Sequence, residues 1–324
     1  MAKEFMKGNE AIGEAAVRGG VRFFAGYPIT PQSELPEYLS WRLPEVGGVF
    51  VQGESEVASI NMVYGAAGTG ERVLTSSSSP GVSLKQEGIS YIAGAQLPCV
   101  IMNVMRGGPG LGSIQAGQGD YFQATKGGGH GDYHLVVFAP ASVQESIDLM
   151  SVAFDTADKY QCPVMIVADG MICQMMEPVV LPEMKEYKVD LEKKPWAANG
   201  HGLSKKSGRS IINSMYITTE ALSEHNEVLQ ACYREIEANE VRYEAYNMEN
   251  AEIVVTAFGT VARIAKSAID ELKEEHATGG TPCSVTDPSG KPIEYTFFRP
   301  QQYGEKYIIK EWPSFCLLYT SPSP

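Results

Sequence analysis

Gly26-Tyr27-Pro28-Ile29-Thr30-Pro31 directly follows the apolar run Val21-Arg22-Phe23-Phe24-Ala25. The apolar run predicts a buried strand, and the prolines predict a rigid turn after it, because each proline fixes its own φ and restricts the residue before it. Thr30 is thereby held extended at the carboxyl end of a strand, where open α/β sheets bind ligands. A threonine N-cap followed by proline at the first helical position is the alternative interpretation of the same residues.

Strand-like and helix-like stretches alternate through the half of the chain that contains this turn. Apolar runs joined by helical crossovers predict a parallel sheet covered by helices on both faces. A glycine-rich segment between Arg106 and Asp132 predicts a long functional loop at the carboxyl edge of that sheet. The expected strands are 21–25, 49–51, 73–74, 99–104, 134–138 and 163–168, and the expected helices are 9–18, 55–67, 82–95 and 143–158.

The chain beyond this α/β region has a different character. A polar stretch over 182–208 predicts an inter-domain connection, and 218–246 predicts one long polar helix. A strand over 251–258 and a helix over 261–275 would start a second α/β unit. We therefore expect a first domain over 1–181, a linker over 182–217, and the long helix with the start of a second domain over 218–276. The atypical tail, 277–324, is turn-rich and indicates a frameshift or a joined fragment.

Composition excludes several classes of function. A formal net charge of −13 argues against nucleic-acid binding, which relies on clustered lysine and arginine. No run approaches the ~18 apolar residues of a membrane span. The six cysteines form no Cys-x-x-Cys pair, so no zinc or iron–sulfur signature is present. His130 and His134 lack the carboxylate spacing of a metal site. No secretory signal is evident, and its absence favours the cytoplasm.

Several ordered motifs together resemble one known family. They are Gly8-Asn9-Glu10-Ala11-Ile12, the turn with Gln32-Ser33-Glu34, the segment from Gly117 to Thr125, and the run from Gly127 to Asp132. Over about residues 3 to 275 the chain resembles the alpha subunit of the 2-oxoacid:ferredoxin oxidoreductases, most of all the 2-oxoisovalerate members. The resemblance implies a parallel-sheet thiamine-diphosphate-binding domain of the pyrimidine type, then a smaller, incomplete α/β domain like the transketolase C-terminal one.

The resemblance also implies a reaction and partners. A 2-oxoacid, coenzyme A and oxidised ferredoxin would give acyl-CoA, carbon dioxide and reduced ferredoxin, with thiamine diphosphate as the electron sink. The sequence has no Gly-Asp-Gly motif with a following asparagine, so a thiamine-binding beta subunit would supply the diphosphate and magnesium site. A gamma subunit, a ferredoxin-like subunit and ferredoxin complete the implied set of protein partners, and no iron–sulfur cluster is expected in this chain.

Glu56 is the expected catalytic residue. Activation of thiamine requires a desolvated carboxylic acid against the pyrimidine ring nitrogen, and Glu56 rather than Glu54 takes this place by match to the family motif. A glutamate favoured by the dipole at a helix N-terminus is the alternative explanation.

Arg106 and Thr30 are the expected substrate-binding residues. Arg106 follows the 99–104 strand, and a guanidinium group there would bind the substrate carboxylate through two parallel hydrogen bonds. Thr30 would supply a further hydrogen bond to the same carboxylate or to the keto oxygen. Tyr27, Ser78, Ser79 and Gln118 are expected as further pocket residues, and a polar loop before a helix N-terminus is the alternative explanation for the serines.

Alternatives remain open at this point. Pyruvate and 2-oxoglutarate are rival substrates, and the chain is alternatively a non-catalytic scaffold subunit or a fragment. A non-oxidative thiamine enzyme is disfavoured because the diphosphate motif is absent, and a dinucleotide fold is disfavoured because no Gly-x-Gly-x-x-Gly follows a strand.

Overall fold

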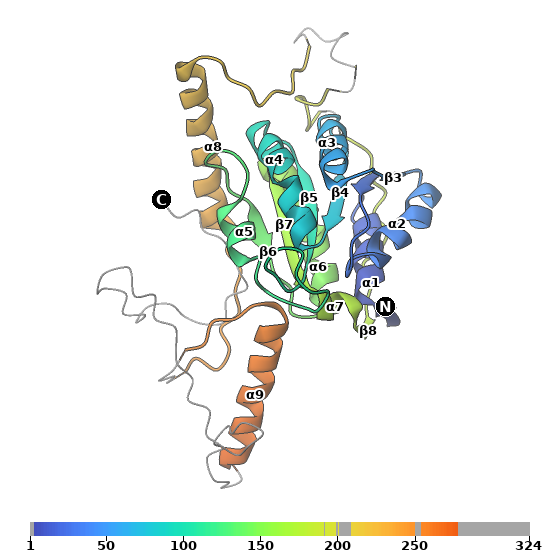
Figure 1. Ribbon diagram of the computed structural model, residues 1–324, viewed down its shortest axis with the longest axis vertical. Coiled ribbons are helices and arrows are strands. Elements are labelled where there is room, and N and C mark those ends of the chain that lie inside the picture. Colours follow the sequence, from blue (N-terminus) through green and yellow to red (C-terminus); the bar gives the residue numbers. More distant parts are fainter. Residues whose placement is uncertain (1–2, 191, 199, 201–208, 250–253, 278–324) are drawn as a thin grey trace, which may run out of the picture.

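A six-stranded parallel sheet forms the centre of the computed structural model, which describes residues 3–190, 192–198, 200, 209–249 and 254–277 (Figure 1). The strand order is β3-β2-β4-β5-β7-β6, and each neighbouring pair is parallel. The parallel sheet predicted from the sequence is confirmed. The strands are β2 (Phe23–Gly26), β3 (Val49–Gln52), β4 (Val73–Ser77), β5 (Cys99–Met105), β6 (Val136–Phe138) and β7 (Pro163–Asp169).

Helices cover both faces of the sheet because its strands are apolar on both sides. In β5, Val100 and Met102 point into one core, whereas Cys99 and Ile101 point into the other. The first core lies under α1, α2 and α6, and the second under α3 and α4. These helices are α1 (Gly8–Arg18), α2 (Glu34–Glu45), α3 (Glu56–Ala67), α4 (Ser79–Gly94) and α6 (Val143–Tyr160).

The proline turn differs in one respect from the alternative interpretation given above. Helix α2 begins at Glu34, and its N-cap residue is Ser33, so Thr30 is not an N-cap and Pro31 is not the first helical residue. Thr30 and Pro31 instead lie in a turn between β2 and α2, with a cis peptide bond between them. The turn stands at the carboxyl end of β2, as the sequence predicts.

Short elements at the edge of the domain escape sequence prediction. β1 (Glu4–Lys7) and β8 (Met176–Val179) pair antiparallel in a separate two-stranded sheet. Helix α5 (Tyr121–Lys126) interrupts the glycine-rich segment that the sequence predicts as one loop, and α7 (Gly170–Gln174) follows β7 directly. None of these elements exceeds six residues, so none gives a clear period in hydrophobicity.

The C-terminal part carries two helices, α8 (Thr219–Asn239) and α9 (Gly259–Ala277), and α9 extends away from the sheet (Figure 1). Helix α8 ends at Asn239 and not near Tyr246 as predicted. The strand expected over 251–258 is absent from the described residues 254–258, because an isolated strand leaves its backbone groups without partners. The atypical tail lies outside the described residues from 278 on. No helix of the described part is long and apolar enough to cross a membrane.

Candidate functional site

Four side chains hold the turn after β2 by its backbone carbonyl groups. Gln32 Nε2 donates to the Tyr27 carbonyl at 3.1 Å, and Arg106 Nη1 donates to the Thr30 carbonyl at 2.8 Å. Asn9 Nδ2 and Gln174 Nε2 both donate to the Pro31 carbonyl, at 2.9 Å and 2.8 Å. Fixing the carbonyl groups leaves the side chains of Tyr27 and Thr30 exposed at the surface of the site. The turn is therefore a rigid platform with free hydroxyl groups.

Glu56 occupies the first turn of α3, just past the carboxyl end of β3. Ser55 caps this helix, because its hydroxyl accepts a hydrogen bond from the Ala58 amide at 3.1 Å. The Glu56 side chain is 6% exposed, yet within the described residues its carboxylate takes part in no hydrogen bond or salt bridge. A nearly buried carboxylate that no protein group donates to has acceptor positions open to a ligand.

The end of β4 faces Glu56 with two further unpartnered groups. Ser77 and Ser78 are fully buried, and neither hydroxyl has a hydrogen-bond partner in the described structure. Gly81 lies in the first turn of α4, which follows these serines. A Cβ atom at this position would lie 2.1 Å from Ser77 Oγ and 2.7 Å from Glu56 Oε1. Because Gly81 has no side chain, the Ser77 hydroxyl and the Glu56 carboxylate can both lie close to this position.

Ser79 belongs to a different network, which links the strand ends to the glycine-rich segment. Its hydroxyl donates to Asp120 Oδ2 at 2.6 Å and accepts from the Arg106 amide at 3.0 Å. Asn103 Nδ2 donates to the same Asp120 oxygen at 2.9 Å. This network fixes the start of α5 against β4 and β5.

Arg106 follows β5 and is 6% exposed. Its Nη1 donates to the Thr30 carbonyl, and its Nη2 donates to the Leu111 carbonyl at 2.7 Å. A guanidinium group has five N–H donors, so these two bonds leave three, and Nε is buried without a partner. Arg106 thus links the turn after β2 to the glycine-rich loop by hydrogen bonds, and its other three N–H groups are available to a ligand.

Gln118 lies at a junction with the C-terminal part. Its Nε2 donates to the Phe258 carbonyl at 2.9 Å and approaches Asp169 Oδ2 at 3.5 Å. Thr260 Oγ1 donates to Asp169 Oδ1 at 2.8 Å. Gln118, Asp169 and Thr260 help to line a cavity of about 250 Å³.

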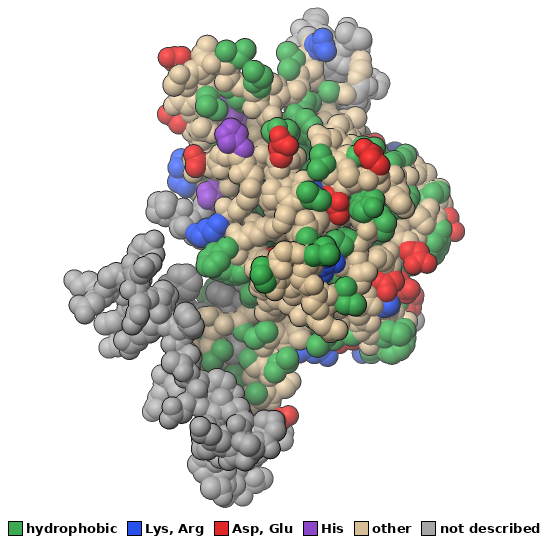
Figure 2. Space-filling view, viewed as in Figure 1, with side chains coloured by type: hydrophobic (Ala, Val, Ile, Leu, Met, Phe, Trp, Pro, Cys, Tyr) green, Lys and Arg blue, Asp and Glu red, His purple; other side chains and the backbone are tan. Residues whose placement is uncertain are grey.

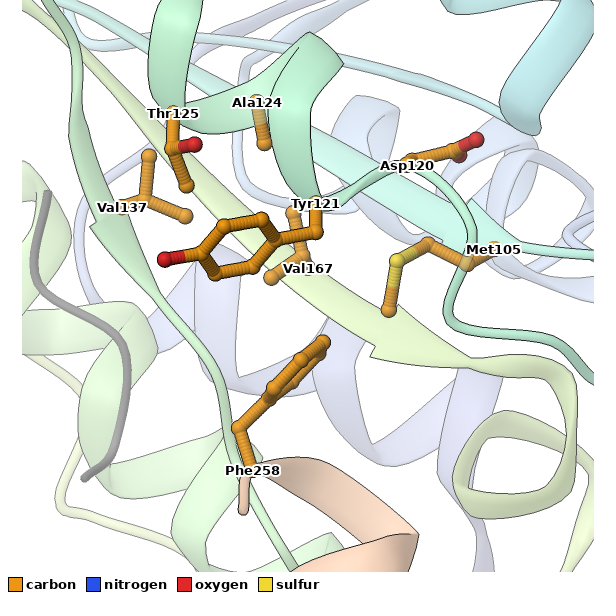
Figure 3. Close-up of a pocket in the computed structure, with 8 residues that line it drawn as sticks. All are labelled: Met105, Asp120, Tyr121, Ala124, Thr125, Val137, Val167 and Phe258. Carbon is orange, nitrogen blue, oxygen red and sulfur yellow. The ribbon is translucent and has the colours of Figure 1, made fainter. Parts of the chain in front are cut away.

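Phe258 completes the same junction from the apolar side. Figure 3 shows its ring facing Tyr121 beneath α5, with ring centroids 6.1 Å apart. The C-terminal segment is therefore held against the sheet domain by both polar and apolar contacts. The Tyr121 and Phe258 rings belong to a second, smaller pocket, which is lined by Met105, Asp120, Tyr121, Ala124, Thr125, Val137, Val167 and Phe258.

Exposed hydrophobic side chains surround the site. Val57 on α3, Leu84 on α4 and Phe122 on α5 are all more than two-fifths exposed. Figure 2 shows hydrophobic side chains spread over the face that these helices present. Leu111 and Ile114, on the loop before α5, extend this exposed set. Such a rim around a polar site is typical of a surface that another protein covers.

Histidine and cysteine side chains do not gather into a metal site. Within the part of the chain that the structure describes, no group of three or more His, Cys, Asp and Glu side chains is placed to hold a metal ion. His134 packs edge-on against Tyr233 at 5.1 Å between ring centroids, and burial lowers the pKa of this histidine. Cys99 is buried in the sheet, and burial raises the pKa of its thiol to about 12.

Sequence reasoning missed several residues of this region. Asn103 and Asp169 lie within one residue of the ends of the expected strands 99–104 and 163–168, so the argument used for Thr30 and Arg106 applies to them as well. Gln32 lies in the motif that follows the proline turn. Lys85 is fully buried in α4, where its Nζ donates to Thr75 Oγ1 at 2.5 Å and to the Ser76 carbonyl at 2.9 Å. No signal in the sequence marks this lysine as buried.

Comparisons with known proteins agree on one family. Residues 14–245 match the family described as "Pyruvate flavodoxin/ferredoxin oxidoreductase, thiamine diP-bdg". The chain is 50% identical over 276 residues to the ketoisovalerate oxidoreductase subunit VorB of Methanothermobacter marburgensis, covering 85% of this chain and 77% of that subunit. It is 35% identical over 294 residues to the 2-oxoglutarate synthase subunit KorA of Methanocaldococcus jannaschii, covering 85% of this chain and 80% of the relative.

A solved structure has the same fold. The 2-oxoglutarate:ferredoxin oxidoreductase from Magnetococcus marinus superposes with a TM-score of 0.72 at 24% identity. The superposition covers 89% of this chain, which spans 55% of that longer chain. The fold predicted from the sequence is thus confirmed, and so is the resemblance to this group of enzymes. The chain belongs to the 2-oxoacid:ferredoxin oxidoreductase family and contains its thiamine-diphosphate-binding domain.

Proposed function

We propose that this chain is the alpha subunit of a thiamine-diphosphate-dependent oxidoreductase that acts on branched-chain 2-oxoacids. The reaction joins a 2-oxoacid, coenzyme A and oxidised ferredoxin to give acyl-CoA, carbon dioxide and reduced ferredoxin. The observation that carries the proposal is Glu56, a buried carboxylate with no hydrogen-bond donor among the described residues, in a chain that is 50% identical to a ketoisovalerate oxidoreductase subunit.

The residues around Glu56 fit the pyrimidine ring of thiamine diphosphate. An aromatic ring with nitrogen atoms needs hydrogen-bonding groups that no protein atom already uses, and Glu56, Ser77 and Ser78 offer them. The backbone of Gly81 leaves the space beside the carboxylate open. Exposed Val57 and Leu84 on the adjoining helices supply apolar surface for the edges of the site.

In this proposal Glu56 would be the residue that shares a proton with the ring nitrogen. When bound, thiamine diphosphate supplies the electron sink for decarboxylation. The protein's part is to hold a carboxyl group where water does not compete for its proton. The capped N-terminus of α3 fixes the carboxyl group against Gly81, so its direction is set before the ring arrives.

Arg106 and Thr30 bind and orient the 2-oxoacid. The three guanidinium N–H groups outside the Thr30 and Leu111 bonds are donors for a carboxylate. The exposed Thr30 hydroxyl stands on the same turn as the carbonyl that holds Arg106, so both donors belong to one rigid unit. Tyr27 and Ser78 line the same region, whereas Ser79 and Gln118 act by holding α5 and the segment before α9.

Partner subunits complete the enzyme in this proposal. A beta subunit carries the diphosphate and magnesium site and covers the apolar rim around Glu56, while a gamma subunit and a ferredoxin-like subunit serve coenzyme A and electron transfer. The complex works in the cytoplasm, with ferredoxin as acceptor, and this chain carries no iron–sulfur cluster. A second candidate substrate is 2-oxoglutarate, which the 35% identity to a 2-oxoglutarate synthase subunit favours. Pyruvate is the third substrate to test.

An anaerobic viologen-reduction assay tests the proposal. The chain is co-produced with its beta, gamma and ferredoxin-like subunits, and 2-oxoisovalerate, 2-oxoglutarate and pyruvate are offered with coenzyme A. Reduction that requires coenzyme A and is fastest with 2-oxoisovalerate supports the proposal. Faster reduction with 2-oxoglutarate moves the assignment to the second candidate. A complex that assembles and binds thiamine diphosphate but reduces viologen with none of the three acids contradicts it, and a Glu56→Gln complex as active as the wild type assigns the chain a scaffold role.

A further inference from the structure

Lys85 is a fully buried lysine that has no role in the proposed reaction as described so far. It lies in the middle of α4, its exposed fraction is 0%, and its ammonium group donates to Thr75 Oγ1 and to the Ser76 carbonyl. Burial of a charged group is costly, and two neutral oxygen acceptors compensate only in part. An apolar side chain of this length would pack in α4 without that cost, so the amine calls for a functional explanation.

The packing of α3 on α4 places Lys85 behind Glu56. A Cβ atom at Gly81 would lie 2.7 Å from Glu56 Oε1, and a Cβ atom at Gly88 would lie 2.5 Å from Ile60 Cγ2. The two helices therefore touch at both glycines. Lys85 lies between these points on α4, one turn after Gly81, since residues four apart share a helix face.

The lysine side chain points back toward the Glu56 end of this contact. Long side chains in a helix lean toward its N-terminus, which takes the Lys85 ammonium group in the direction of Gly81. Its acceptors Thr75 and Ser76 immediately precede Ser77, whose hydroxyl meets the same Gly81 position as the Glu56 carboxylate. One ammonium group thus supports the strand end that forms the floor of the site.

The electrostatic environment of Lys85 is dominated by two opposed effects. Burial lowers the pKa of the amine to about 7, while the negative potential of Glu56 and, to a smaller degree, Cys99 raises it. Glu56 reaches it from α3 and Cys99 from β5, and both belong to elements packed against α4. The charge of Glu56 therefore acts on Lys85 even though no direct hydrogen bond joins them.

We propose that Lys85 is a positioning residue: its ammonium group holds the end of β4 beneath Glu56 without contacting the cofactor. The inference rests on the proposed function, because it assigns Glu56 the ring nitrogen. Removal of the ammonium group loosens Ser77 and Ser78, which directly follow its acceptors Thr75 and Ser76.

Binding of thiamine diphosphate as a function of pH tests this role in the co-produced complex. Lys85→Met keeps most of the side-chain volume and removes the charge. We expect it to weaken binding by about tenfold, the order found for groups that support a ligand-contacting residue, and to remove the part of the pH profile of binding that follows the titration of Lys85 near pH 7. Thr75→Val removes one acceptor of the ammonium group and is expected to shift both quantities in the same direction by less.

Controls separate this role from a general effect on stability. Lys159→Met removes an exposed ammonium group that pairs with Glu240 far from the site, and we expect binding and its pH profile to stay at wild-type values. A Lys85→Met complex with wild-type affinity and pH profile overturns the inference. If that variant does not assemble, Thr75→Val decides by the same two quantities. If the wild-type complex binds thiamine diphosphate but fails to reduce viologen with any of the three 2-oxoacids, the proposed function alone is contradicted. The binding profiles still report on Lys85 in that case.

Discussion

The carboxylate of Glu56 rests against the bare backbone of Gly81, with less room between them than one methyl group needs. Glu56 Oε1 lies 2.7 Å from the place that a Cβ atom of residue 81 would occupy, and Ser77 Oγ lies 2.1 Å from it. Both distances are shorter than real Cβ contacts. Residue 81 is therefore a glycine for reasons of space, and the space belongs to the candidate site.

Gly81→Ala is expected to displace Glu56 or Ser77 and to weaken the binding of thiamine diphosphate. Overpacking of this kind also lowers the free energy of unfolding by about 1–3 kcal/mol. Titration of the cofactor by fluorescence quenching measures the first effect, and urea unfolding measures the second.

Gly65→Ala is the matched control for that variant. Gly65 lies in α3, and no atom lies within 4 Å of the place that its Cβ would occupy. The substitution is expected to leave cofactor binding unchanged and to stabilise the protein by up to about 1 kcal/mol, the difference between glycine and alanine in a helix. Equal cofactor affinity in both variants would show that Gly81 has no part in the site.

Arg106→Ala is expected to lower the kcat/KM of viologen reduction by about 100-fold or more, because loss of one partner of a buried, hydrogen-bonded charge costs 2–5 kcal/mol. Arg106→Lys should recover little of the lost kcat/KM. A lysine ammonium group lacks the fork geometry of arginine, so it cannot bond the Thr30 carbonyl, the Leu111 carbonyl and a substrate at once. Steady-state kinetics of the assembled complex measures both variants.

Loss of the hydrogen bond from Arg106 to the Leu111 carbonyl gives a second readout for the same variants. Without the guanidinium group, the segment between Arg106 and α5 is expected to become accessible to protease. Arg234→Ala, at an exposed position of α8, is the control and should change neither kinetics nor proteolysis. Normal kinetics in Arg106→Lys would argue against a bidentate role.

Thr260→Val is expected to loosen α9 from the sheet domain. Thr260 Oγ1 donates to Asp169, which also caps α7 by accepting from the Met171 amide at 3.0 Å. Removal of the hydroxyl leaves the buried Asp169 oxygen one donor short, at a cost of about 1–3 kcal/mol. Hydrogen exchange should rise in α9, while β5 and β7 keep their protection. Ser267→Ala, on the exposed side of α9, is the control; equal exchange in the two variants would contradict the role of Asp169.

The sheet and its ligand edge could be predicted from the sequence because the signals are local. Residues 21–25 and 99–104 are apolar runs of strand length, and Thr30 and Arg106 follow them within five residues. The structure brings the Arg106 guanidinium to the Thr30 carbonyl at 2.8 Å. Parallel strands end at one edge of a sheet, so residues far apart in sequence meet there without any further information.

Other features depend on contacts that no local pattern encodes. Lys85 stands among polar residues in Ser83-Leu84-Lys85-Gln86-Glu87 and resembles a solvated helix position. Its burial results from the close approach of α3 at Gly81 and Gly88, which is a tertiary event. The missed strand β1 forms only because β8, about 170 residues later, pairs with it.

The pH dependence of stability gives an independent check on the buried lysine. The pKa of Lys85 in the folded protein is lowered to about 7 from an ordinary value of 10.5, because burial disfavours the ammonium form. Between these two pH values the unfolded chain holds a proton on this side chain that the folded chain has released, so the free energy of unfolding rises with pH across this window. Below about pH 7 both states are protonated, and this contribution is flat. Lys85→Met removes the titrating group. We therefore expect the difference in unfolding free energy between wild type and Lys85→Met, measured with urea, to grow in favour of the wild type from pH 7 to pH 10. Parallel curves for the two proteins would mean that the amine keeps its ordinary pKa and that Lys85 is not desolvated in solution.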